Sequence, residues 1–426
     1  MKSKFQSDIK ELVSEQVISK DVASKIEAYY ISKQSNSPNR LLTVFGVLGS
    51  ALVGMGIILI LAHNWDNFSK TIKTVFAFLP LIIGQLIVGY VILKERSETW
   101  KESSGVFLFF AVGASMALIS QIYNIPDDLS AYLLKWILLC APLIYLLKSN
   151  MLAILHVIFA TSYACSYGYF LGNETPWLYI LLLAIVVPRY MNLLKKKEAQ
   201  NISSVLNWLI PLSLIISFGA FIKNNEQFGY LIYIILFGLL FNIGKTTFFY
   251  HQKFRRNGYY VLGSLGTIFM LLLVSFKWLW ENIFTKAISF NSQEFYIALV
   301  LCVASIILLS FSYSKKWFTR FNPFQIVFLI FILVFFIGLA SSILPMILIN
   351  ALLLFLGIFT VKEGISHLSF GTLNYGLLII SALILCRFFD TNMSFVIRGL
   401  LFVSVGLGFF FTNYVIIKRQ KLSNKK

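Results

Sequence analysis

Charged residues are scarce in this chain. They make up 13% of its 426 residues, whereas soluble domains carry about 25%. Hydrophobic residues make up 58%, and the mean hydropathy is +0.79. This composition excludes both a water-soluble globule and a disordered chain. A polytopic membrane protein remains, because each span takes about 20 residues and the length admits many of them.

Cysteine and histidine are also rare, with four of each. The cysteines fall inside apolar runs without a C-x-x-C pair, which indicates packing residues without a redox or zinc role. The histidines are scattered, with no acid or cysteine at metal-ligand spacing. One of them, His156, lies inside a predicted span, where it either relays protons or is a hydrogen-bonded packing residue.

The motifs of common enzymes are missing as well. The sequence contains no phosphate-binding Gly-x-x-x-x-Gly-Lys loop and no Gly-x-Ser-x-Gly elbow. Nor does it place two carboxylates for acid–base work. We therefore expect a protein that is not an enzyme and that uses no cofactor and no metal.

Acidic residues are half as numerous as basic ones, 18 against 36, which gives a net charge of +18. In a soluble protein this excess would favour nucleic-acid binding. Here the basic residues lie between apolar segments, where they set the orientation of the spans. We therefore expect the lipid bilayer as a partner and no nucleic acid.

The first 40 residues form the one long polar stretch of the sequence. Because they are polar and mixed in charge, we expect no cleavable signal peptide in them. Apolar residues recur at helical spacing on either side of Ser19, which is placed to cap the second of two helices. Residues 1–40 are thus predicted to be a cytosolic amphipathic helical hairpin with a linker. Because so short a piece buries little core alone, it either packs on the membrane part or a partner, or is a solvated tail.

Residues 41–426 are predicted to be an all-α, multi-span transmembrane domain. The apolar runs are near the length that a hydrocarbon core demands, and the short alternating segments of an outer-membrane barrel are absent. We predict about 14 spans, or 12 if a hairpin near 340–342 or at 203–244 is re-entrant, followed by a basic cytosolic tail at 417–426. The predicted spans are residues 41–62, 71–93, 105–123, 131–147, 151–170, 176–194, 203–222, 229–244, 258–278, 294–314, 323–340, 342–361, 367–386 and 395–416.

The basic residues predict the orientation of these spans. With the N-terminus in the cytosol, 28 of the 36 lysines and arginines fall in cytosolic segments or near the cytosolic end of a span. This asymmetry favours an even number of spans with both termini cytoplasmic. Small residues at every fourth position, as at Gly113 and Ala117, favour close helix packing. Five prolines lie within spans, where they either kink helices along a substrate path or reflect the general frequency of proline in membrane helices.

Polar residues gather at those span ends that this orientation places on the extracytoplasmic face. A lysine or arginine within the membrane is costly unless it snorkels, pairs or lines a wet cavity. These residues either converge on a pocket for an anionic group such as a phosphate or carboxylate, or anchor the helix ends together with an aromatic belt. The candidate binding residues are Asn64, Trp65, Asp66, Gln121, Tyr123, Asn124, Lys135, Arg387, Asp390 and Arg398.

Short motifs carry a resemblance to a bacterial family of predicted membrane proteins classed as a domain of unknown function. In chain order they are Gly54-Met55-Gly56, Asn64-Trp65-Asp66, Gly113-Ala114 and Gln121-Ile122-Tyr123-Asn124. The resemblance is best over residues 5–170; among the remaining spans, at 176–416, only the stretches near Arg387 and Arg398 look like the tail of longer members. It implies a multi-pass protein of the bacterial cytoplasmic (inner) membrane with a cytosolic N-terminal helical segment. It implies no catalytic residue.

Two hypotheses of different classes follow. The first is a non-enzymatic protein that binds or transports a small anionic or amphipathic molecule, such as a lipid-linked one, at the extracytoplasmic pocket. The second is a structural or sensory scaffold that recruits a cytosolic protein partner through residues 1–38. A third, an intramembrane enzyme such as a lipid-modifying transferase, lacks a recognisable nucleophile or metal set.

Overall fold

The structure, a computed structural model, has helices joined by turns and short connections in the residues that it describes. The described residues are 9, 11–26, 65–126, 128–170, 174–195, 200–250, 254–284, 288–315, 321–390 and 395–423. They divide into two compact units, Met1–Phe76 and Ala77–Lys426. The predicted first span, 41–62, lies outside the described residues.

The first unit contains part of the predicted hairpin. Residues 20–26 are helical, and the Ser19 hydroxyl oxygen accepts the backbone N–H of Val22 at 3.3 Å, so the predicted cap is confirmed. The short 3-10 helix η1 (Trp65–Asn67) lies in the same unit. The Lys73 ammonium, from the first turn of α4 (Lys70–Leu93), lies 5.8 Å from the centre of the Trp65 ring.

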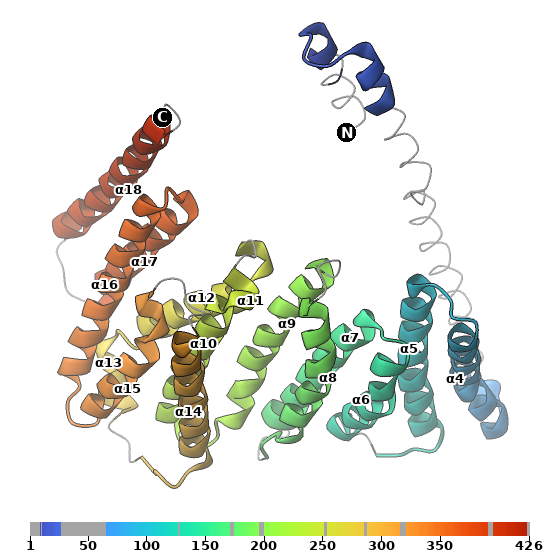
Figure 1. Ribbon diagram of the computed structural model, residues 1–426. Helices are drawn as coiled ribbons and strands as arrows, with labels where there is room; N and C mark the ends of the chain where they lie inside the picture. The colour runs from blue at the N-terminus through green and yellow to red at the C-terminus, as the bar shows by residue number, and fades with distance from the viewer. Residues whose placement is uncertain are drawn as a thin grey trace. The chain divides into compact units, whose positions relative to one another are not determined.

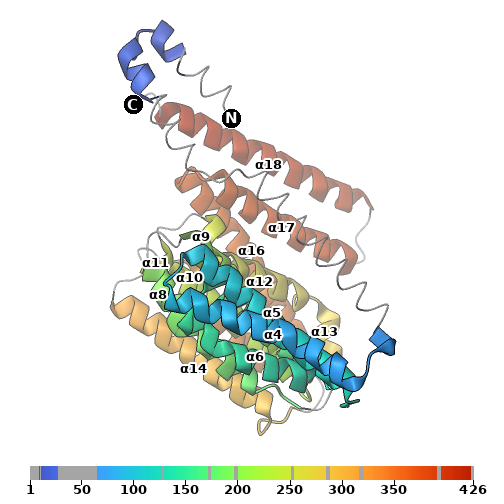
Figure 2. The ribbon, with the colours of Figure 1, turned by 90° about the vertical axis from the view of Figure 1, so that its right-hand side faces the viewer.

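The second unit is a succession of long apolar helices that pack on their neighbours (Figures 1 and 2). Ten helices among the described residues are long and apolar enough to cross a membrane. After α4, the helices are α5 (Glu98–Ile122), α6 (Leu129–Leu146), α7 (Asn150–Cys165), α8 (Leu178–Lys195), α9 (Gln200–Phe218), α10 (Glu226–Lys245), α11 (Thr247–Tyr250), α12 (Gly258–Leu273), α13 (Lys277–Asn282), α14 (Gln293–Ser314), α15 (Val327–Gly338), α16 (Ile343–Ser366), α17 (Phe370–Asp390) and α18 (Phe395–Ser423).

Helix α10 is the centre of the unit. It packs against α12, α14, α15 and α9, and 14 of its 20 residues are buried. The other helices bury one face and present apolar side chains such as Leu86 and Val300 outward. A helix that is apolar on its outer side suits a lipid environment, because its backbone N–H and C=O groups are hydrogen-bonded within the helix and need no water. The chain is therefore a polytopic helical membrane bundle, as predicted.

Glycine lets α12 approach α10 closely. A Cβ atom at Gly263 would lie 2.5 Å from the backbone nitrogen of Phe241, and one at Gly244 would lie 2.4 Å from the backbone nitrogen of Tyr260. Both distances are far inside van der Waals contact. Because lipid provides no hydrophobic drive for helices to associate, contacts of this kind supply much of the packing energy.

Two predicted spans differ from the helices that form. The run 258–278 is divided: α12 ends at Leu273, and the chain turns before α13 begins at Lys277. The turn is stabilised from outside, because the Trp280 indole donates to the Val274 carbonyl at 2.8 Å and the Asn350 amide donates to the Ser275 carbonyl at 3.2 Å. The run 323–340 starts as a 3-10 turn, Pro323–Gln325, so that α15 has 12 residues.

The last predicted span, 395–416, lies within α18, which continues to Ser423 and so includes most of the predicted tail.

Four of the five prolines lie inside helices, in α4, α6, α8 and α9. The fifth, Pro345, lies in the first turn of α16. The N–H groups of a helix's first turn have no partner within the helix, so a proline there costs no helical hydrogen bond. The buried side chain of His156 contacts the Leu182 carbonyl oxygen at 2.9 Å through its Nε2 atom.

Candidate functional site

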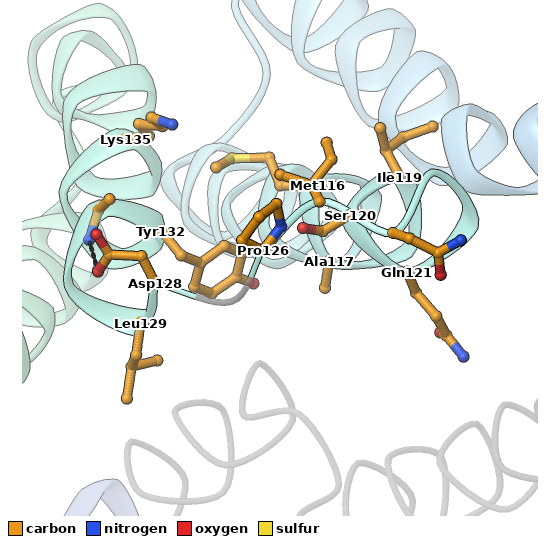
Figure 3. Close-up of a pocket in the computed structure, with 13 residues that line it drawn as sticks. Met116, Ala117, Ile119, Ser120, Gln121, Pro126, Asp128, Leu129, Tyr132 and Lys135 are labelled. Atoms are coloured by element: carbon orange, nitrogen blue, oxygen red, sulfur yellow. Dashed lines mark hydrogen bonds between the residues drawn. The ribbon is translucent and has the colours of Figure 1, made fainter.

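A polar cavity lies where α5 ends and α6 begins (Figure 3). Its volume is about 970 Å³, within the range of small-molecule sites. The last two turns of α5, the connection that follows and the first two turns of α6 form its walls. The lining residues are Met116, Ala117, Ile119, Ser120, Gln121, Asn124, Ile125, Pro126, Asp128, Leu129, Ala131, Tyr132 and Lys135.

The wall from α5 ends in a left-handed turn. Asn124 has a φ of 51°, a conformation that asparagine adopts more readily than most residues. This turn lets the backbone N–H of Ile125 reach back to the Ser120 carbonyl at 2.9 Å. The chain therefore reverses within a few residues, and the polar end of α5 faces the start of α6.

The wall from α6 starts at a helix cap. The Asp128 carboxylate accepts the backbone N–H of Ala131 and the hydroxyl of Ser130, both at 3.0 Å. These hydrogen bonds, with a smaller contribution from the charge of Lys135, lower the pKa of Asp128 below its usual value. The carboxylate therefore stays ionised, and its hydrogen-bonding capacity is directed largely to its own helix.

Side chains from α6 fix the two walls relative to each other. The Tyr132 hydroxyl donates to the Gly113 carbonyl at 2.9 Å, and the Trp136 indole donates to the Phe109 carbonyl at 2.8 Å. A Cβ atom at Gly113 would lie 2.2 Å from the Trp136 ring. Gly113 thus admits a large side chain from α6, which the predicted small-residue face of this span does not by itself reveal.

Lys135 is the cation of the cavity. It lies six residues after the start of α6, about 9 Å along the helix axis at 1.5 Å per residue. Its side chain is exposed, and Figure 3 shows it on the α6 side, on the same wall as Asp128. Of the ion pairs among the described residues, none involves Lys135.

The structure brings some of the predicted site residues together and separates others. Gln121, Asn124 and Lys135 line the cavity. Tyr123 lies at the end of α5 with 54% of its surface exposed and does not line the cavity. Ser120, Asp128 and Tyr132 also line the cavity and are not among the candidate binding residues predicted from the sequence, although Tyr132 lies three residues before Lys135 and thus on the same helix face.

Arg387 lies in a different place from the cavity. It is in the last turn of α17, which packs against α16, α12 and α18. Its guanidinium donates to the Ser275 hydroxyl at 3.1 Å and lies 4.9 Å from the centre of the Phe276 ring. The predicted grouping of Arg387 with Gln121 and Lys135 in one pocket is therefore not what the fold produces, because Arg387 contacts the turn after α12 and does not line the cavity.

The other predicted site residues are not among those that line this cavity. Trp65 and Asp66 belong to the first unit, and Asn64 lies outside the described residues. Asp390 and Arg398 lie in helices α17 and α18, but their side chains are outside the described part. Among the described residues, no group of three or more histidines, cysteines and acids is placed to hold a metal ion.

Hydrogen bonds between segments link helix ends in two separate groups. In one group, the Glu102 carboxylate at the start of α5 accepts the backbone N–H groups of Asn150 and Met151 at the start of α7. In the other, the Thr175 hydroxyl before α8 donates to the Gln293 side chain at the start of α14. Each group contains ends that the charge pattern assigns to one side of the membrane, the first to the cytosolic side and the second to the opposite side. The grouping agrees with the alternation of the predicted spans.

The predicted orientation places the cavity on the extracytoplasmic side, which cysteine labelling can test. In intact cells, we expect a membrane-impermeant maleimide to label an Ile125→Cys variant but not a Ser97→Cys variant. Both positions are exposed turns, one at each end of α5. Labelling of Ser97→Cys is expected only after the cells are permeabilised. The reverse pattern would place the cavity in the cytosol.

Residues 10–153 match the family described as "Predicted membrane protein (DUF2157)". This match confirms the resemblance drawn from the sequence, and it covers about a third of the chain. No curated protein and no solved structure matches the chain. All the residues that line the cavity fall within the matched stretch.

Proposed function

We propose that this protein is a non-enzymatic membrane protein that binds a small anionic molecule in the α5–α6 cavity, on the extracytoplasmic side. The observation that carries the proposal is the meeting of Gln121, Asn124 and Lys135 around one cavity. The sequence alone predicts each of these residues for the site, from its chemistry and its predicted side of the membrane. A pocket with a few convergent polar groups is a common form of binding site.

The donors of the cavity favour an anion. The Asp128 carboxylate is engaged by Ala131 and Ser130 on its own helix, whereas the Lys135 ammonium is not held by an ion pair with any described residue. The side-chain amides of Gln121 and Asn124 and the Ser120 hydroxyl add neutral donors. An ammonium that lines the same cavity as amide and hydroxyl donors suits a phosphate or carboxylate group.

Glycerol 3-phosphate is a suitable probe for thermal unfolding of the full-length protein in detergent. At 100 times its dissociation constant, a ligand stabilises the native state by about 2.7 kcal/mol. We expect Lys135→Met to weaken binding of the probe about 10- to 100-fold, because a hydrogen bond to a charged group contributes about 1.5–3 kcal/mol. Lys135→Arg is expected to keep most of the affinity, since it retains the charge.

The control is Lys277→Met, which removes a half-exposed lysine that pairs with Glu281 on α13, outside the cavity. It should leave the affinity for the probe unchanged. If Lys135→Met binds glycerol 3-phosphate as tightly as the unmodified protein, Lys135 is a helix anchor and the cavity is not an anion site.

One observation favours the scaffold as a second candidate. Three apolar side chains of the N-terminal segment are exposed: Leu12, Val17 and Val22, at 40%, 66% and 43% of their surface. A cytosolic protein partner could cover them. If the scaffold candidate is right, expression of a variant without residues 1–38 in a strain that lacks the protein should fail to restore its function. Expression of Lys135→Met in the same strain should restore that function fully.

A further inference from the structure

An apolar groove continues from the cavity along the sides of α4, α5 and α6. Its volume is about 650 Å³, and it shares Met116 and Ile119 with the cavity. The cavity and the groove are therefore adjoining compartments, one rich in polar side chains and the other almost entirely apolar. The groove is lined by Phe78, Leu81, Gln85, Val88, Gly89, Ile92, Leu108, Val112, Ser115, Met116, Ile119, Leu139 and Leu143.

Helix α6 presents both compartments on a single face. Lys135 lines the cavity, while Leu139 and Leu143 line the groove. The spacing of four residues places the three side chains in one row. From Lys135 to Leu143 the row extends about 12 Å at 1.5 Å per residue. A cationic group near the helix end is thus followed by apolar surface toward the middle of the bundle.

This order of groups matches that of a phospholipid, whose phosphate lies at the membrane surface and whose acyl chains extend inward. We propose that the cavity and the groove together bind an anionic phospholipid, with its phosphate at Lys135 and one acyl chain along α4, α5 and α6. The inference rests on the proposed function, whose ligand class it names. The cavity receives the headgroup, and the groove receives the chain.

The physical origin of selectivity differs between the two compartments. An acyl chain gains no hydrophobic energy on moving from bilayer to groove, because lipid is as apolar as the leucine side chains. The groove contributes van der Waals contact with the chain. Discrimination between lipids therefore falls to the headgroup site, where Lys135 favours a net negative headgroup over a zwitterionic one.

Gly89 offers a way to fill the groove without disturbing the fold. It lines the groove, and a Cβ atom built on it has no atom within 4 Å. A Gly89→Phe substitution therefore places a ring in the space for the chain without a backbone clash. Gly371 on α17 also has open space around its Cβ position and does not line the groove, so Gly371→Phe is the matched control.

The experiment uses the full-length protein in lipid nanodiscs with two photoreactive probes. One is a phosphatidylglycerol and the other a phosphatidylcholine, each with a diazirine in one acyl chain. We expect peptides from residues 77–146 to take up at least threefold more label from the phosphatidylglycerol. Gly89→Phe should lower this labelling at least threefold, Gly371→Phe should not change it, and Lys135→Met should abolish the preference between the probes.

The possible failures are distinguishable. If glycerol 3-phosphate binds through Lys135 but both lipids label residues 77–146 equally, the cavity holds a soluble anion and the phospholipid proposal is wrong. If Gly89→Phe and Gly371→Phe give equal labelling, the groove is not the chain site. If neither glycerol 3-phosphate binding nor lipid preference responds to Lys135→Met, the proposed function itself fails.

Discussion

Replacing Glu294 with alanine is expected to destabilise the bundle by about 2–6 kcal/mol, because two backbone N–H groups lose their acceptor and each such loss costs about 1–3 kcal/mol. The Glu294 side chain is fully buried at the start of α14. Its Oε1 atom accepts the backbone N–H groups of Lys223 and Asn224, both at 2.8 Å. The carboxylate therefore holds the connection between α9 and α10 against α14, and alanine would remove the acceptor from both donors.

Thermal unfolding in detergent, followed by size-exclusion chromatography, measures this effect. We expect Glu294→Ala to lower the unfolding temperature by several degrees, and Glu294→Gln by less, because the amide keeps one acceptor oxygen. Glu98→Ala is the control, since its side chain is 72% exposed and, among the residues that the structure describes, forms an ion pair with Lys101 alone. Such pairs contribute about 0–1 kcal/mol. Equal stability of Glu294→Ala and Glu98→Ala would contradict the structural role of Glu294.

Replacing Gly263 with leucine is expected to prevent α12 from packing on α10. The Cβ atom would lie 2.8 Å from the Cα atom of Phe241 as well as close to its backbone nitrogen, so the obstacle is main chain and cannot rotate away. Overpacking of a core costs about 1–3 kcal/mol, and more when the backbone must move. Because α10 is central, we expect little folded protein to be recovered.

The matched control for this substitution is Gly371→Leu, where the added side chain meets open space. The yield of monodisperse protein after solubilisation is the measurement, and Gly371→Leu should equal the unmodified protein. Gly263→Ala is the stricter test of this close approach, because its single methyl group is the Cβ atom that would overlap the Phe241 backbone. A normal yield of Gly263→Ala would show that α10 and α12 separate easily.

The sequence predicts helices well where the signal lies within the helix. Long apolar runs predict α4 to α10, to within a few residues at most of their ends. The short connection between α5 and α6 also explains why Gln121, Asn124 and Lys135 meet, since residues that flank a tight turn end on the same side.

The rest depends on contacts between distant segments. The end of α12 at Leu273 relies on hydrogen bonds from Trp280 and Asn350 to carbonyl groups of the turn, and no pattern within 258–278 reveals them. The separation of Arg387 from the cavity depends on which helices pack together. In lipid, that choice is set by the fit of side chains such as Trp136 over Gly113, which periodicity does not report.

The shortness of α12 and α15 has a consequence for the bilayer around the protein. Their 16 and 12 residues extend about 24 and 18 Å at 1.5 Å per residue. A hydrocarbon core is about 30 Å thick, so these helices create a hydrophobic mismatch unless the membrane thins locally or the longer α10 and α14 shield their ends from acyl chains. Thickness-dependent sorting among membranes follows from such a mismatch, at a fraction of a kcal/mol per ångström.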